Sequence, residues 1–93
     1  MSTDFSSIRN HLERPVFEAV LGAHGRYPGV DPSLLPDVAC VALNRLPPRY
    51  IRHAVDLAFY QSEKERTDNE RAVLDIVNYA FEFVQARVAM RAR

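Results

Sequence analysis

Two consecutive prolines, Pro47 and Pro48, constrain the fold of this chain more than any other feature. Each proline disfavours helical geometry in the residue before it and lacks the backbone N–H that a helix would use. The residues before them, 37–46, place their apolar side chains on one broad side of a helix. The sequence therefore predicts a helix of about Leu35 to Arg45 that ends in a rigid, extended turn.

Basic and aromatic side chains crowd around this diproline turn. Four of them lie within eight positions: Arg45, Arg49, Tyr50 and Arg52. Arginine pairs bidentately with phosphate and stacks on bases, and tyrosine can stack or hydrogen-bond. These four residues are the candidate site for an anionic or nucleotide ligand. The alternative is structural, with the arginines paired to nearby carboxylates and Tyr50 in the core.

Four residues of this segment, 37–50, are interpreted as structural. Pro47 and Pro48 make the turn rigid, and Asn44 is expected to hydrogen-bond backbone groups of the turn. Cys40 lies among valine and alanine residues and is expected to be a small buried hydrophobe. As the one cysteine, it allows neither an intrachain disulfide nor a Cys-rich zinc site.

The run from Asp37 to Tyr50, DVACVALNRLPPRY, resembles the signature of the ComFB family of late competence development proteins. The chain length and the order of predicted helices also fit, over residues 6–90. The resemblance implies a receptor for a cyclic dinucleotide, cyclic di-GMP or cyclic di-AMP, acting in competence, pilus or motility control. Some family members carry several cysteines that bind zinc; this sequence departs from that pattern, so neither a metal nor another cofactor is carried over.

Size and composition indicate one small domain that associates with a second copy. Ninety-three residues form a single domain, 1–93, with a disordered tail at residues 1–5. A chain this short buries only about 60–65% of its unfolded surface. Because 47% of its residues are hydrophobic, we expect some apolar surface to be buried in a homodimer.

Charge and hydropathy limit the classes of partner that we expect for this chain. Twelve basic and twelve acidic residues give a net charge of zero, which makes a DNA-coating role unlikely because that role needs a broad basic field. The sequence lacks a run of about 18 apolar residues, and its start resembles no signal peptide, so we expect a cytoplasmic protein without membrane insertion.

The remaining elements are predicted to be mostly helical. Residues 6–24 fit two short helices or one helix kinked at Pro15, and 25–33 fit a loop. Residues 54–60 alternate apolar and polar side chains; they tolerate a helix, but we favour a strand. A lone strand needs a partner, which could be the same strand of a second subunit.

The C-terminal part predicts a long helix. Ser62 and Thr67 each precede a glutamate by three positions, so a short turn from Ser62 and a helix from about 68 to 91 are expected. Its apolar stripe comprises Val73, Ile76, Val77, Ala80, Val84 and Val88. Phe81 and Phe83 are expected to flank this stripe.

The residue pattern gives little support for catalysis or metal binding. The histidines His11, His24 and His53 are scattered, and no two of them or Cys40 have the spacing of a local metal chelate. We therefore expect no enzymatic activity and no metal. The resulting prediction is a mainly α fold of four to five helices with one short strand, forming a ligand-sensing regulator that signals to an unknown partner protein. The alternative is a structural adaptor between proteins that binds no ligand.

Overall fold

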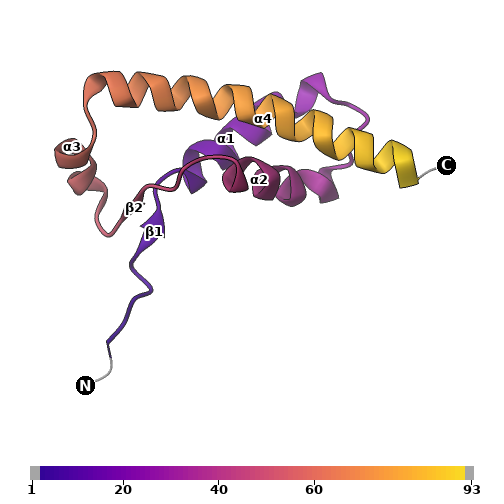
Figure 1. Ribbon diagram of the computed structural model, residues 1–93. Coiled ribbons are helices and arrows are strands. Elements are labelled where there is room, and N and C mark those ends of the chain that lie inside the picture. Colours follow the sequence, from indigo (N-terminus) through magenta and orange to yellow (C-terminus); the bar gives the residue numbers. More distant parts are fainter. Residues whose placement is uncertain (1–2, 92–93) are drawn as a thin grey trace.

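A computed structural model describes residues 3–91 of the chain (Figure 1). Within that range, three helices contain ten or more residues: α1 (Glu13–Ala23), α2 (Leu35–Asn44) and α4 (Glu63–Arg91). A single helical turn, α3 (Leu57–Tyr60), and 3₁₀ turns at His24–Arg26, Pro32–Leu34 and Ala54–Asp56 connect them. The mainly α prediction is confirmed, but a count of four to five helices is not supported.

Helix α4 forms one long layer, and α1 and α2 pack against it (Figure 1). Its apolar stripe faces them, and Val73, Val77, Ala80 and Val84 are buried there as predicted. Phe81 was predicted to flank the stripe but is fully buried. Its ring stacks on that of Tyr27 at a centroid distance of 4.5 Å. The stripe ends before Val88, which is 40% exposed.

Helix α4 begins earlier than predicted because Ser62 caps it. The Ser62 hydroxyl accepts a hydrogen bond from the Glu65 backbone N–H at 3.1 Å, which is the capping geometry expected from the sequence. Thr67 does not cap a second helix. Its hydroxyl lies inside α4 and donates to the Glu63 carbonyl at 3.1 Å.

The helical prediction for residues 6–24 is wrong over its first half. Arg9–Asn10 form strand β1, and α1 begins only at Glu13. Pro15 therefore lies in the first turn of α1, where its missing N–H costs no intrahelical hydrogen bond. The next stretch, 25–33, is mostly irregular as predicted, apart from the ends of two 3₁₀ turns.

The strand predicted at residues 54–60 is also wrong, since this segment forms a 3₁₀ turn and α3. Its alternating apolar side chains do not line a sheet: Val55 is 70% and Phe59 is 82% exposed. The extended backbone after the prolines supplies the strand instead, as β2 (Tyr50–Ile51). It pairs antiparallel with β1 of the same chain, so strand pairing across a dimer is not supported.

Two segments extend from the helical body (Figure 1). One is the turn region around α3. The other is the N-terminal arm, which we define as residues 3–8; residues 1 and 2 of the tail predicted at 1–5 lie outside the described range. Among the helices of residues 3–91, none combines the length and apolar character needed to cross a membrane.

Candidate functional site

The diproline turn is clamped by the residues before α1. The side-chain carbonyl of Asn10 accepts hydrogen bonds from the backbone N–H groups of Leu12, at 3.1 Å, and Arg49, at 3.0 Å. The His11 N–H donates to the Arg49 carbonyl at 2.7 Å. These contacts join the start of the chain to the exit of the turn, about forty positions away in the sequence.

Asn10 thus performs the role that the sequence suggested for Asn44. The Asn44 side chain is exposed at the end of α2 and forms no hydrogen bond within residues 3–91. The sequence around Asn10 does not indicate this role, because Asn10 and Arg49 become neighbours only when β1 and β2 pair. Pro47 and Pro48 lie where predicted, in an extended and exposed segment after the buried Leu46.

The Arg49 side chain is engaged by the protein itself. Its guanidinium donates to the Tyr60 carbonyl at 2.9 Å and forms an ion pair with Glu65 in the first turn of α4. The pair is half-exposed, so water weakens it. Arg49 therefore joins the diproline turn to the segment that leads into α4.

Arg45 lies at a different part of α4. Its guanidinium carbon is 4.8 Å from the centre of the Tyr79 ring, a cation–π contact. Tyr79 and Glu65 are fourteen positions apart on α4, about 21 Å along the axis at 1.5 Å per residue. The side chains of Arg45 and Arg49 consequently contact α4 at well-separated points, and the predicted cluster is divided.

Tyr50 and Arg52 remain open to solvent. Tyr50 lies opposite Asn10 in the strand pair and is 64% exposed, so it does not belong to the core. The alternation of the strand buries the next residue, Ile51, and turns Tyr50 outward. Arg52 follows immediately, is exposed, and forms no ion pair with another described residue.

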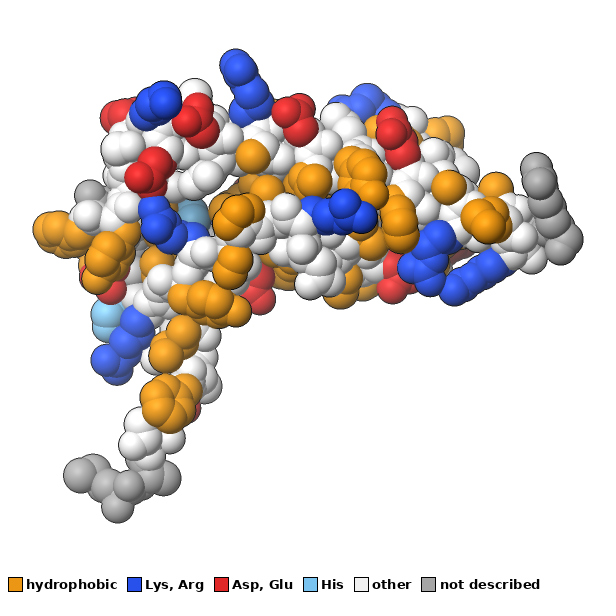
Figure 2. Space-filling model, viewed as in Figure 1, with side chains coloured by type: hydrophobic (Ala, Val, Ile, Leu, Met, Phe, Trp, Pro, Cys, Tyr) orange, Lys and Arg blue, Asp and Glu red, His pale blue; other side chains and the backbone are white. Residues whose placement is uncertain are grey.

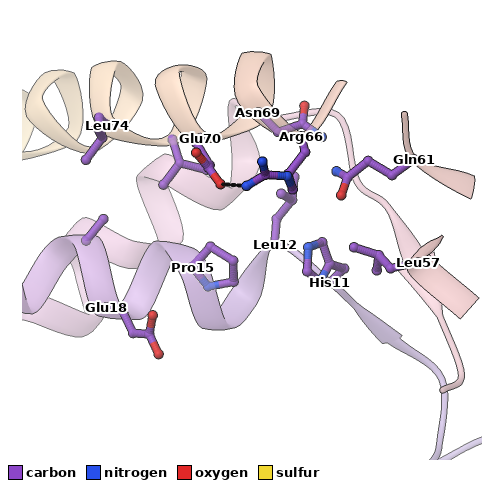
Figure 3. Close-up of a pocket in the computed structure, with 12 residues that line it drawn as sticks. His11, Leu12, Pro15, Glu18, Leu57, Gln61, Arg66, Asn69, Glu70 and Leu74 are labelled. Atoms are coloured by element: carbon purple, nitrogen blue, oxygen red, sulfur yellow. Dashed lines mark hydrogen bonds and ion pairs between the residues drawn. The ribbon is translucent and has the colours of Figure 1, made fainter. Parts of the chain in front are cut away.

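Two cavities share Leu12 and Asn69 as lining residues, and the smaller of them adjoins the turn. The smaller, of about 230 Å³, lies behind the prolines and is lined by Leu12, Pro47, Pro48, Arg49, Glu65 and Asn69. The larger, of about 620 Å³, lies between α1, α3 and α4 (Figure 3). Its polar wall includes His11, Gln61, Arg66, Asn69 and Glu70. Sequence patterns could not indicate this cavity, because its walls come from separate elements that meet only in the fold.

Electrostatics make the larger cavity unsuited to an anion. Arg66 is already paired with Glu70 (Figure 3) and with Glu63, at 2.9 Å each, so its charge is compensated. Partial burial, with a contribution from the nearby charge of Arg9, lowers the pKa of His11, which favours its neutral form. Glu18 adds a further carboxylate to the wall. A phosphate would find little uncompensated positive charge here.

The groups considered for metal binding do not converge. His24 contacts the Val30 carbonyl through Nε2 at 2.8 Å, and His53 is exposed beside the Ala54–Asp56 turn. Among residues 3–91, no three side chains of His, Cys, Asp or Glu are grouped closely enough to hold a metal ion. Cys40 was expected to be buried, but it is exposed, because it lies on the side of α2 that faces away from α4.

Comparison with protein families supports the resemblance of the signature. The family model of the late competence development protein ComFB matches residues 9–88, which include β1, the diproline turn and nearly all of α4. Searches among curated proteins and among solved structures each gave no significant match.

Proposed function

Because this chain belongs to the ComFB family of late competence development proteins, we propose that it is a non-enzymatic regulatory protein that binds a cyclic dinucleotide. Family membership indicates a competence-related regulatory role. The proposal adds the ligand, cyclic di-GMP or cyclic di-AMP, and a cytoplasmic homodimer that passes the ligand state to a regulatory partner in competence, pilus or motility control.

The observation that carries the proposal is that Tyr50 and Arg52, two positions apart, are both exposed. We call these two residues the Tyr50–Arg52 pair. An exposed tyrosine ring offers a face on which a purine can stack, and an arginine offers a planar donor for phosphate. Both follow a backbone held by the prolines and by Asn10, so ligand binding would cost conformational entropy mainly in the two side chains and not in the backbone. This chemistry suits a ligand that has both bases and phosphates.

A homodimer would match the symmetry of the ligand. A cyclic dinucleotide has two bases and two phosphates related by a pseudo-two-fold axis. Two copies of the chain would present two Tyr50–Arg52 pairs to it. Arg49 belongs to the proposed site as the residue that holds the diproline turn against Glu65. Arg45 would have to leave the Tyr79 ring to reach a ligand.

Calorimetry tests the proposal directly. The chain at about 100 μM should give saturable heat with cyclic di-GMP or cyclic di-AMP, a concentration at which a weak micromolar site is still detected. GMP and AMP serve as controls because they have one base and one phosphate and cannot bridge two pairs. Absence of heat with both cyclic dinucleotides would remove the ligand from the proposal.

A second candidate is a structural adaptor without a ligand. The engagement of Arg49 by Glu65 and the Tyr60 carbonyl favours it, because this arginine already has partners in the protein. In an adaptor, the arginines of the signature would only stabilise the turn. Replacing the exposed Arg52 by Ala separates the two candidates: a receptor loses affinity at unchanged stability, whereas an adaptor has no affinity to lose.

A further inference from the structure

This chain exposes more surface than a compact monomer of its mass. Its accessible surface is 6925 Å², whereas the scaling for monomeric proteins gives about 5,500 Å² at 10.6 kDa. Its radius of gyration is 15.5 Å, against about 12 Å for a compact domain of this length. The excess, about 1,400 Å², is larger than the roughly 800 Å² that each partner buries in a standard interface.

Part of this excess lies in the N-terminal arm, which projects from the helical body (Figures 1 and 2). The arm carries two large apolar side chains that are open to solvent, Phe5 at 69% and Ile8 at 48% exposure. Its hydrogen bonds are local, from Ile8 N–H to the Phe5 carbonyl and from Ser6 N–H to Asp4. The arm therefore has no hydrogen bond to the helical body within the described residues, and its apolar side chains are only partly covered by their own chain.

A complementary surface lies on the side of α1 and α2 that faces away from α4. It is a groove of about 550 Å³, and apolar side chains make up its wall except at Glu13. Phe17 and Leu21 contribute from α1 and are 47% and 69% exposed. Cys40 and Leu43 contribute from α2. We call this surface the α1–α2 groove.

We propose that two copies of the chain exchange their N-terminal arms, each arm placing Phe5 and Ile8 in the α1–α2 groove of the other copy. The strand pair and the Asn10 clamp fix the direction of the chain at the base of the arm, and that direction leads away from the body of its own copy. A reciprocal exchange covers both apolar surfaces at once and closes around a two-fold axis. The inference rests on the proposed homodimer, but it does not depend on nucleotide binding.

Disulfide trapping tests the exchange, because Cys40 is an exposed thiol within the groove. Ser6→Cys places a second thiol on the arm and keeps both Phe5 and Ile8. Under mild oxidation, this variant should form a covalent dimer whose cross-linked peptide joins positions 6 and 40. Adding Cys40→Ser should abolish that peptide. Asp75→Cys, on the exposed side of α4, is the matched control and should not cross-link to Cys40.

Each other outcome contradicts the exchange. A 6–40 disulfide within one chain would show that the arm folds onto its own groove. Absence of the 6–40 peptide would show that the arm does not enter the groove of either copy.

Sedimentation supplies an independent measurement. The wild-type chain should sediment as a dimer at about 100 μM, a concentration sufficient for a micromolar equilibrium. The double variant Phe5→Asp, Ile8→Asp should sediment as a monomer with unchanged helical circular dichroism. A wild-type monomer, or a double variant that stays dimeric, would overturn the inference. A dimer that binds no cyclic dinucleotide would contradict the receptor proposal alone.

Discussion

At the scale of single residues, the four candidate ligand contacts differ in what they already contact. Arg45 covers the Tyr79 ring, and Arg49 is bound to Glu65 and the Tyr60 carbonyl. Tyr50 and Arg52 are exposed. The structural interpretation of the signature therefore applies to Arg45 and Arg49. The proposed ligand contacts are Tyr50 and Arg52. The sequence located the turn correctly, but it could not assign these contacts because Glu65 and Tyr79 are distant in the chain.

Arg49→Ala should lower the free energy of unfolding by about 1 kcal/mol, since it removes one half-exposed ion pair and one hydrogen bond to a carbonyl. For a domain of this size, that corresponds to a fall in Tm of roughly 4–8 °C. Thermal unfolding followed by circular dichroism measures it.

A double-mutant cycle checks the cause. Glu65→Gln should cost stability in the wild-type background and almost none in the Arg49→Ala background, because the pair is then already broken. Arg52→Ala is the matched control and should leave Tm unchanged. Equal effects of Glu65→Gln in both backgrounds would show that the Arg49–Glu65 pair contributes nothing.

Two local expectations were wrong for a common physical reason. Cys40 was expected to be buried because its neighbours in sequence are apolar, yet neighbours on a helix point in different directions. Asn44 was expected to bond the adjacent turn, yet Asn10 does so from across the strand pair. In both cases the environment of the side chain is set by tertiary contacts.

At the scale of elements, strong periodicity and capping signals were informative. The predicted helix of Leu35 to Arg45 agrees with α2 to within one residue, because Pro36 and the diproline delimit it. The C-terminal helix was also predicted, and Ser62 explains its early start. Residues 6–12 and 54–60 were misassigned because short segments follow their tertiary contacts more than their pattern.

The Asn10 side chain supports the strand pair through two hydrogen bonds. Asn10→Ala should lower the free energy of unfolding by about 1–2 kcal/mol, because the N–H groups of Leu12 and Arg49 both lose their acceptor. Urea denaturation of the full chain measures this change.

Two variants control for the role of Asn10. Asn10→Asp retains a side-chain oxygen as acceptor and should recover most of the stability. Asn44→Ala should change it by less than about 0.5 kcal/mol, as expected at an exposed position. A larger loss for Asn44→Ala than for Asn10→Ala would contradict the assignment of the clamp.

At the scale of the whole molecule, the buried core is separate from the segments that project from it. The core is concentrated where α1, α2 and the middle of α4 meet. The arm and the α3 region lie outside it, and they carry exposed apolar side chains such as Phe5 and Phe59. The fold is thus stabilised at its centre, while its projecting segments leave apolar side chains exposed.

Phe81 is the largest fully buried side chain of this centre. Phe81→Ala should cost about 3–5 kcal/mol, a large part of the stability of so small a domain. Phe83→Ala is the matched control on the same helix; its side chain is about one-third exposed, so we expect a loss of about 1 kcal/mol or less. Urea titrations of both variants compare them, and similar losses would contradict the position of the core.

The central claim is that the exposed Tyr50–Arg52 pair binds a cyclic dinucleotide, while Arg49 supports it. The most direct measurement is the affinity of Tyr50→Ala and Arg52→Ala for cyclic di-GMP and cyclic di-AMP, with Arg71→Ala, at an exposed position of α4, as control. Each of the first two should weaken binding about tenfold or more, at unchanged Tm, and Arg71→Ala should bind as the wild type does. Wild-type affinity in both Tyr50→Ala and Arg52→Ala would contradict the claim.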